Sequence, residues 1–522
     1  MQNIEQAKVV NAASVVGLAT MLSRIFGFLR DVVVAAFFGT SAAADAFFVA
    51  FRIPNLLRRL LGEGSLTVAF VPVFTQYLTQ KSKGEAVELA NVVFTVLSII
   101  LVFVSLLGII FSPWIVLATA PGFANTPDQF DLAVYLNRIM FPYIFFISLV
   151  ALCMGILNSL RHFAAPALSP VTLNISMIAA TFLLYPYFTE PIFALAIGVM
   201  LGGAIQLAMQ WPFLIKMGIR LKPNFNFRHP GLKQIGLLLI PTLIGSGIYQ
   251  INILVGTILA SLLPKGSVSY LYYADRIVEL PLGVFAIAVG TAALPSLSEQ
   301  VSRGSFTEMK KTISFSLRLI LFVSIPATIA LIILREPIVS VLFQRGEFQA
   351  SSTMATAQAL LFYAIGLWAF SVIRVIDAAF FALQDRKSPL KAGFIAFIVN
   401  VVMGIILMIP LKHGGLALAT SIATSVNVLI LSIILWNKIG SFLDKEFYDS
   451  LKKVFIASLV MAAFIYTVHF VIGWDIHDAL LNKCLYLFSC IIAGCLAFFT
   501  VSFMTQNQDL LFLWKRLKKK LP

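Results

Sequence analysis

Long apolar runs dominate the chain and are interrupted by short polar connections. An apolar helix of about 20 residues crosses the hydrocarbon core of a bilayer. By this criterion the pattern predicts fourteen membrane-spanning helices. They are expected at residues 9–38, 45–74, 90–112, 132–157, 166–187, 192–215, 234–262, 268–297, 313–334, 354–382, 391–410, 414–437, 454–473 and 482–504. The expected fold class is an all-α polytopic membrane protein.

The composition supports this interpretation. Of the 522 residues, 60% are hydrophobic and 12% are charged, whereas soluble domains carry about 25% charged residues. The N-terminus is polar and the first apolar run is too long for a signal peptide, so none is expected. The four cysteines all lie in apolar runs and have no metal-ligand spacing, which predicts neither a metal centre nor a disulfide framework.

The basic residues alternate between connections. Of the 38 lysines and arginines, 24 fall in the N-terminus and every second connection, five fall in the remaining connections, and nine lie inside the predicted spans. The positive-inside rule then predicts that both termini are cytoplasmic. The net charge of +15 therefore reflects loops on one membrane side, and no nucleic acid is expected as a partner.

The sequence also contains an internal repeat. The segment Ala50–Ile53 matches Ala274–Ile277, and three pairs of prolines recur at nearly the same offset. An offset of six spans gives both copies one orientation, the parallel-repeat arrangement found in transporters. We expect two six-helix lobes, at residues 1–220 and 221–440, around a central cationic cavity. Residues 441–522 would add two further spans and a basic cytoplasmic tail.

Two predicted spans are interrupted by glycine and proline. The second holds Pro54 and the run Gly62–Gly64, and the eighth holds Pro281 and Gly283. Breaks at corresponding places in two repeats indicate a transport site. Ordinary kinks whose backbone groups neighbouring helices satisfy are the alternative.

The nine cations inside the spans are all arginines. A cation at the centre of a bilayer costs roughly 2.5–3.5 kcal/mol on insertion scales, and the planar guanidinium favours forked recognition of phosphate or carboxylate. Only about five acidic residues lie at similar depth, so an anionic ligand is expected to balance the remainder. The nine are Arg24, Arg30, Arg52, Arg58, Arg59, Arg138, Arg276, Arg318 and Arg374.

Structural explanations compete for some of these arginines. Arg276 and Arg374 each precede an acid by three residues, Glu279 and Asp377, and could form salt bridges within one helix. Either member of the Arg58–Arg59 pair could reach the membrane surface along its aliphatic stem. Arg138 and Arg318 have few polar neighbours in sequence, which favours a structural role for both.

Motifs for energy coupling and covalent chemistry are missing from the sequence. It contains no GxxxxGK[ST], HExxH or GxSxG motif. The chain is therefore expected to be a transporter, neither an enzyme nor an ATP-driven pump, and to have no cofactor. Transport would draw on the membrane potential or on a monovalent cation, and the sign of that potential favours export of an anion.

Several motifs together resemble one family, the bacterial lipid II flippases (MurJ, also called MviN). They are SRIFGFLRD, DAFFVAFRIPNLLRRLLGEG and AFVPVF near the N-terminus, followed by APGF, FPYI, ILNS, LNISMI, YYADRI and LPSLS. The resemblance implies the fold of the multidrug/oligosaccharidyl-lipid/polysaccharide (MOP) exporters. It further implies alternating access, by which lipid II moves from the cytoplasmic to the periplasmic leaflet of the bacterial inner membrane for peptidoglycan and cell wall synthesis.

The resemblance also assigns residues. It implies that the last two helices form a groove for the polyprenyl tail, and it names Asp377 as a candidate sodium ligand. Expected partners are lipid II, membrane lipids and cell-wall synthesis proteins. The expected substrate-binding residues are Arg24, Arg30, Arg52, Arg58, Arg276, Arg374, Ser23 and Asn55. The expected gating or charge partners are Asp31, Asp45, Glu63, Asp275 and Glu279.

Other function classes make different predictions. A drug or cation exporter of the same fold would have an acidic cavity, which the surplus of arginines disfavours. A flippase for another polyprenyl-pyrophosphate-linked oligosaccharide shares the pyrophosphate chemistry and is disfavoured only by the motifs. A membrane scaffold without transport would leave the internal charge unexplained.

Overall fold

A computed structural model describes residues 2–59 and 66–518, and every regular element in these ranges is a helix. The chain divides into two compact units, Met1–Val268 and Ser269–Pro522. The two units meet at residue 268 and not near residue 220, because α10 packs within the first unit. The lobe boundary near residue 220 was drawn from the sequence repeat and stays a prediction. The all-helical fold class is confirmed.

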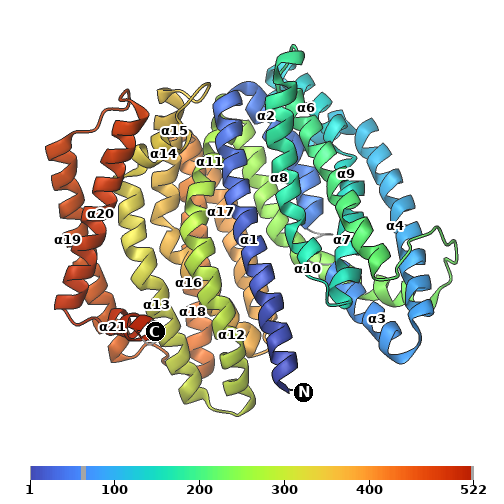
Figure 1. Ribbon diagram of the computed structural model, residues 1–522. Helices are drawn as coiled ribbons and strands as arrows, with labels where there is room; N and C mark the ends of the chain where they lie inside the picture. Colours follow the sequence, from blue (N-terminus) through green and yellow to red (C-terminus); the bar gives the residue numbers. More distant parts are fainter. Residues whose placement is uncertain (1, 60–65, 519–522) are drawn as a thin grey trace. The chain divides into compact units, whose positions relative to one another are not determined.

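The first unit places its N-terminal helix against the eighth, as Figure 1 shows. Helices α8 and α9 also pack along each other, and α7 packs on α9. Part of the core lies under α3, where the rings of Phe70 and Phe74 stack at 5.2 Å. The elements are α1 (Gln2–Phe38), α2 (Ala42–Leu57), α3 (Leu66–Gln80), α4 (Lys83–Ile110), α5 (Ser112–Thr119), η2 (Pro121–Asn125), α6 (Pro127–Met140), α7 (Tyr143–Ser159), α8 (Ala164–Leu184), η3 (Tyr185–Tyr187), α9 (Ile192–Lys216) and α10 (Pro230–Ser261).

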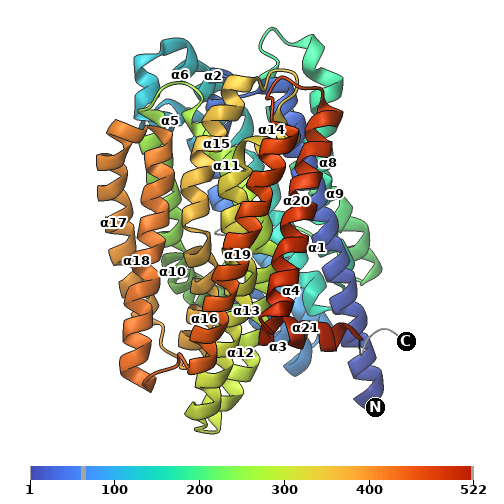
Figure 2. The ribbon, with the colours of Figure 1, turned by 90° about the vertical axis from the view of Figure 1, so that its left-hand side faces the viewer.

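The second unit pairs α17 with α18 and α19 with α20, and both pairs lie side by side in Figure 2. Helix α13 packs on α16 and α19. The elements are α11 (Ser267–Pro281), η4 (Leu282–Ala286), α12 (Ile287–Ser302), α13 (Phe306–Ile333), α14 (Arg335–Phe343), α15 (Ala350–Ile365), α16 (Leu367–Ala382), α17 (Lys387–Leu411), α18 (His413–Ile439), α19 (Lys445–Ile472), α20 (Leu480–Met504) and α21 (Gln508–Lys518).

The order of elements repeats between the units. Helix α4 and helix α13 both have 28 residues, and a short helix, α5 or α14, follows each of them. The paired helices α6–α7 then correspond to α15–α16, α8 to α17, and α9 to α18. This order is consistent with the predicted repeat, which stays a prediction, and in it α19, α20 and α21 would be the addition at its end.

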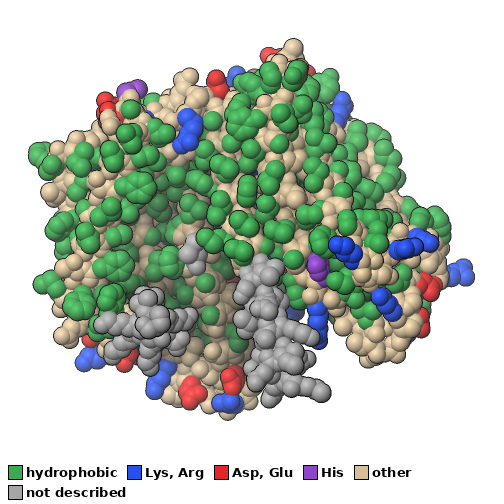
Figure 3. All heavy atoms as spheres, in the orientation of Figure 1, with side chains coloured by type: hydrophobic (Ala, Val, Ile, Leu, Met, Phe, Trp, Pro, Cys, Tyr) green, Lys and Arg blue, Asp and Glu red, His purple; other side chains and the backbone are tan. Residues whose placement is uncertain are grey.

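Membrane-spanning character follows from length and composition. Within the described residues, nine helices are long and apolar enough to cross a bilayer, or up to ten if the bent pair α15–α16 is one span. The remaining predicted spans coincide with α1, with α2 and α3, with α10, and with α11 and α12. The chain is thus a multi-pass membrane protein, and the count of fourteen stays a prediction. On the face that Figure 3 shows, hydrophobic side chains cover the middle of the helices and charged side chains lie mainly near helix ends.

Of the predicted interruptions, the one at Pro281 is a break in the structure, whereas Pro54 lies inside the continuous helix α2. Pro281 ends α11, and the π-helical turn η4 follows before α12. A second bend, of 42°, separates α15 from α16 at Gly366, where a Cβ atom would come within 2.5 Å of the Ser421 hydroxyl. Glu63 and the run Gly62–Gly64 lie outside the described residues.

Candidate anion-binding site

A buried ion pair connects α1 with α8 in the first unit. Arg30 donates to Asp31 Oδ1 from Nε and Nη2, at 3.0 and 2.7 Å, and from Nη1 to Asn174 Oδ1 at 3.0 Å. The Arg30 side chain is 15% exposed and Asp31 only 3%. Arg30 is therefore oriented by a carboxylate and an amide before any ligand arrives, as a preorganised anion receptor requires.

Asn174 completes this arrangement, and its role was not predicted. Its amide nitrogen donates to the Ser23 carbonyl oxygen at 3.4 Å, so the side chain bridges two turns of α1. The one available signal was a polar amide inside the apolar run of α8. Adjacent residues such as Arg30 and Asp31 point in directions about 100° apart around a helix, but the flexible guanidinium reaches its neighbour's carboxylate.

Arg24 lies less than two turns before Arg30 on α1 and differs from it sharply. Its side chain is exposed, and it makes no hydrogen bond or ion pair within the described part of the chain. A forked cation on a helix that otherwise reads as membrane-spanning is thus left available. Together the two residues offer one fixed and one free guanidinium to a ligand.

The predicted residues Asp45, Arg52 and Asn55 lie along α2, and Arg58 follows its last residue. Near the last turn Arg58 Nε donates to Asn55 Oδ1 at 3.0 Å, whereas the partly buried Arg59 makes no such hydrogen bond within residues 2–59 and 66–518. Arg52 is also partly buried. At the opposite end, buried Asp45 accepts a hydrogen bond from the Gly266 backbone at 2.6 Å.

The second unit contributes Arg276 on α11. Its Nη1 atom lies 2.5 Å from Glu279 Oε2 on the same helix, and its guanidinium stacks over the Tyr272 ring at 4.9 Å. The predicted pairing within one helix is therefore present. Glu279 is 48% exposed and Arg276 26%, so the pair remains open to a competing anion. Asp275, the residue before Arg276, is exposed.

Arg374 on α16 lacks the pairing that its spacing allowed. No ion pair joins it to Asp377 within 4 Å among the described residues. Its own backbone lies close to Gly290 of α12, where a Cβ atom would stand 3.1 Å from it. Its guanidinium is thus exposed and Asp377 is half-buried beside it.

Arg318 and Arg138 have contacts of a structural kind. Arg318 of α13 is 9% exposed and lies 2.7 Å from Glu446 of α19 and 3.5 Å from Asp509 of α21. Arg138 packs over the ring of Tyr135 on its own helix at 5.7 Å. Burial raises the pKa of the Asp509 carboxyl, while Ser450 and Arg318 oppose the shift. Arg318, with two carboxylate partners, makes stronger structural contacts than Arg138.

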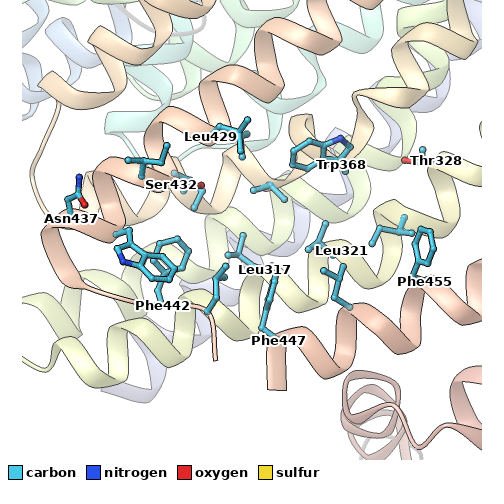
Figure 4. Close-up of a pocket in the computed structure, with 18 of the residues that line it drawn as sticks. Leu317, Leu321, Thr328, Trp368, Leu429, Ser432, Asn437, Phe442, Phe447 and Phe455 are labelled. Atoms are coloured by element: carbon cyan, nitrogen blue, oxygen red, sulfur yellow. The ribbon is translucent and has the colours of Figure 1, made fainter. Parts of the chain in front are cut away.

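The second unit also contains an apolar groove of about 750 Å³. Figure 4 shows that α13, α16, α18 and α19 supply its walls, through residues such as Leu321, Trp368, Leu429 and Phe455. Polar lining atoms are few and come mainly from Thr328, Ser432 and Asn437. The groove has the shape and chemistry of a site for a hydrocarbon chain. Helix α19 of the C-terminal addition forms one wall, but α20 does not line it.

Comparison with solved structures places this helical fold. The chain resembles an inward-facing multidrug resistance MATE family transporter of the MOP superfamily, with a TM-score of 0.66 and 16% identity over 82% of this chain and 98% of that one. It resembles a solved lipid II flippase MurJ in an inward closed conformation more strongly. There the TM-score is 0.79, with 30% identity over 95% of this chain and 99% of the other. The fold is that of a MOP-superfamily membrane transporter.

Sequence comparison narrows this class. Residues 34–485 match the family described as lipid II flippase MurJ. A protein of Buchnera aphidicola subsp. Acyrthosiphon pisum that bears the same family name is 38% identical over 474 residues, covering 91% of this chain and 93% of the relative. The chain belongs to the lipid II flippase MurJ family, a family of transporters and not of enzymes.

Proposed function

We propose that this protein moves lipid II from the cytoplasmic to the periplasmic leaflet by alternating access, and that its arginines bind the anionic head group. Family membership supports the substrate. The pyrophosphate of lipid II is a compact polyanion of the kind that forked guanidinium groups recognise. In this proposal both termini are cytoplasmic.

The observation that carries the head-group assignment is the contrast on α1. Arg30 is held by Asp31 and Asn174, whereas Arg24 is exposed and has no partner in the described residues. An anion bound by Arg24 would lie less than two helical turns from the Arg30 guanidinium, whose orientation Asp31 and Asn174 already fix. In the second unit the solvent-open pair of Arg276 and Glu279 offers a further exchangeable contact.

The apolar groove is the proposed site for the polyprenyl tail. Burying each methylene group of such a tail contributes about 0.8 kcal/mol, so even partial occupancy would hold the lipid while its head group crosses. The lining by Leu321, Trp368 and Phe455 offers no charge that the tail would have to desolvate.

Alternating access requires contacts that form in one state and break in the other. We assign this role to the hydrogen bond from the Gly266 backbone to buried Asp45, because it ties the start of α2 to the connection between α10 and α11. Its loss would free that connection to move. Transport would draw on the membrane potential or on a monovalent cation, for which Asp377 beside Arg374 is the candidate ligand.

Replacing Arg24 by alanine tests the head-group assignment. We expect Arg24→Ala to abolish lipid II translocation in reconstituted vesicles, because the exposed guanidinium has no structural partner whose loss would unfold the protein. Arg24→Lys should also be poor, since a point charge cannot make a bidentate contact. Arg303→Ala is the matched control, because Arg303 is exposed and pairs only with Glu299.

Native mass spectrometry with competing prenyl-pyrophosphate lipids should accompany the transport measurement. Normal translocation by Arg24→Ala would refute the assignment. Equal binding of lipid II and a prenyl-pyrophosphate carrying a different sugar would favour the broader class of oligosaccharide-lipid flippases.

A further inference from the structure

The connection between α9 and α10 runs along the side of α4 instead of crossing solvent. The Lys222 backbone N–H donates to Asn91 Oδ1 at 2.9 Å, and the Asn224 N–H donates to Thr95 Oγ1 at 2.8 Å. Where the connection begins, Lys83 Nζ donates to the Met217 carbonyl at 2.9 Å. Helix α4 therefore holds the segment both where it begins and along its middle. It appears beside the lower part of α4 in Figure 1.

The direction of this path brings two aromatic rings to its far point. Thr95 lies 12 residues beyond Lys83, which corresponds to about 18 Å along the helix, so the connection climbs α4 by that distance before it returns to α10. Just past this point Phe225 and Phe227 are 65% and 54% exposed. Their rings contact edge-to-face at 6.1 Å. The hydrogen bond from the Phe227 N–H to the Phe225 carbonyl tightens the turn.

The same connection is densely cationic. Five exposed basic residues lie in or beside it, and none forms an ion pair within 4 Å in the described parts of the chain. The sequence contains no acidic residue between Glu190 and Asp275. Lys and Arg side chains gather at this end of the first unit in Figure 3. The five are Lys216, Arg220, Lys222, Arg228 and Lys233.

The neighbouring helix surfaces are apolar and aromatic. Trp211 of α9 is partly exposed and contacts the ring of Phe94 on α4 at 6.4 Å, and Ile215 is exposed one turn later. Trp and exposed aliphatic side chains in this order mark the border between head groups and acyl chains. Lys216 and Lys233 lie at the facing ends of α9 and α10, and Lys222 and Arg228 flank the Phe pair.

From this arrangement we infer that residues 216–233 form a binding surface for anionic phospholipid head groups. The unpaired cations attract the phosphates, while Phe225 and Phe227 enter the boundary between head groups and acyl chains. A polybasic segment alone would bind reversibly and depend on salt, and an aromatic pair beside it adds an apolar contact that salt does not screen. The surface lies on the first unit alone and does not depend on the transported substrate.

Native mass spectrometry of the full-length protein with equal amounts of phosphatidylglycerol and phosphatidylcholine tests this surface. The triple variant Arg220→Gln, Lys222→Gln, Arg228→Gln should lose the preference for phosphatidylglycerol by roughly tenfold or more, since each surface cation contributes about 1 kcal/mol. The matched control is the triple variant Arg386→Gln, Lys387→Gln, Lys391→Gln. These three are also exposed and have no ion-pair partner in the described residues.

The outcomes separate the possible sources of the effect. An unchanged preference in the first triple variant would overturn the proposal, as would an equal loss in the control, which would indicate net charge alone. Displacement of the lipid by inorganic phosphate would show a site for the free anion instead. Phe225→Ser, Phe227→Ser should make the remaining phosphatidylglycerol binding more sensitive to salt, and an unaltered salt dependence would contradict the role of the rings.

Discussion

Helices α4 and α13 occupy equivalent places in the order of elements. Helix α4 holds the connection between α9 and α10, whereas α13 holds the connection between α18 and α19 by a different chemistry. On α4, Asn91 and Thr95 accept hydrogen bonds from backbone N–H groups. These contacts are neutral and carry little desolvation cost. Each contributes on the order of 1 kcal/mol.

On α13 the same task falls to Ser314 and Arg318. Ser314 Oγ donates to Asp444 Oδ1 at 2.8 Å, and Arg318 binds Glu446 and the buried Asp509. Ser450 donates a hydrogen bond to the second oxygen of Asp509. The charged version joins three helices, α13, α19 and α21, beside the apolar groove.

The comparison teaches which arginines are open to a ligand. A buried arginine with two carboxylates is committed to structure, because removing one member leaves an uncompensated charge. The Arg24 side chain, which has no carboxylate partner in the described residues, has no comparable structural role. A position inside the membrane therefore does not by itself identify a ligand-binding arginine. The number of carboxylates that contact the arginine indicates whether it is committed to structure.

Removing the ion pairs of Arg318 with Glu446 and Asp509 should produce the largest effect on stability. Arg318→Met leaves Asp509 buried without its cation, which should cost about 3–5 kcal/mol and lower the midpoint of thermal unfolding. Burial already raises the Asp509 pKa. A raised carboxyl pKa contributes stability that is present at low pH and is lost as pH rises through it. The loss in Arg318→Met should therefore be larger at pH 8 than at pH 5.

A second substitution distinguishes this explanation from a simple packing defect. Arg318→Met, Asp509→Asn should be less destabilised than Arg318→Met alone, because the uncompensated carboxylate is gone. Arg303→Gln serves as a control, since its ion pair is exposed and should contribute less than about 1 kcal/mol. No recovery in the double variant would argue against the charge account.

Removing a hydrogen bond between α4 and the connection between α9 and α10 should have an intermediate effect on stability. Thr95→Val removes the acceptor of the Asn224 N–H, at a cost of about 1–2 kcal/mol. Hydrogen exchange of the peptide that contains Asn224 should accelerate. Thr79→Val is the matched control, because exposed Thr79 bonds only carbonyls of its own helix. Equal effects of the two substitutions would show that the connection does not depend on α4.

The smallest effect is expected at the connection between α16 and α17. There Asp385 binds Lys438 at 2.7 Å, whereas at the equivalent connection of the first unit His162 stacks on Phe213 with 5.0 Å between ring centroids. Lys438 and Ser388 hold the pKa of Asp385 well below its ordinary value. Such a depressed pKa contributes stability above the ordinary value of about 3.9, which is lost as pH falls through the folded value.

Asp385→Asn should accordingly cost about 0.5 kcal/mol at pH 7, because Lys438 is 45% exposed. The difference from the parent protein, measured by thermal unfolding, should stay constant to about pH 5 and shrink below about pH 4. A difference that grows on acidification would contradict this sign. Glu299→Gln, in an exposed pair, provides the reference.

Much of the architecture follows from local sequence. The length of the apolar runs predicted the all-helical membrane fold because each run depends on residues near one another in the chain. The break at Pro281 was also predictable, since proline removes a helix hydrogen bond wherever it occurs.

The partners of the arginines were less accessible. Asp31 was expected to be a charge partner and is the sequence neighbour of Arg30, but Asn174 lies 144 residues from Arg30 and was not expected. Glu446 is 128 residues from Arg318, and Asp509 is farther still. Contacts of this separation depend on how helices pack, which periodicity along a single helix does not encode.

The Arg318–Asp509 contact has a consequence for biosynthesis. About 190 residues separate the two, so at roughly 5–20 residues per second the ribosome needs on the order of 10–40 s to reach the carboxylate after the arginine. During that interval α13 must enter the bilayer with its guanidinium lacking its buried counter-ion. Helix α21 is thus what finally neutralises a helix synthesised long before it, and the second unit cannot complete its fold until residue 509 has been made.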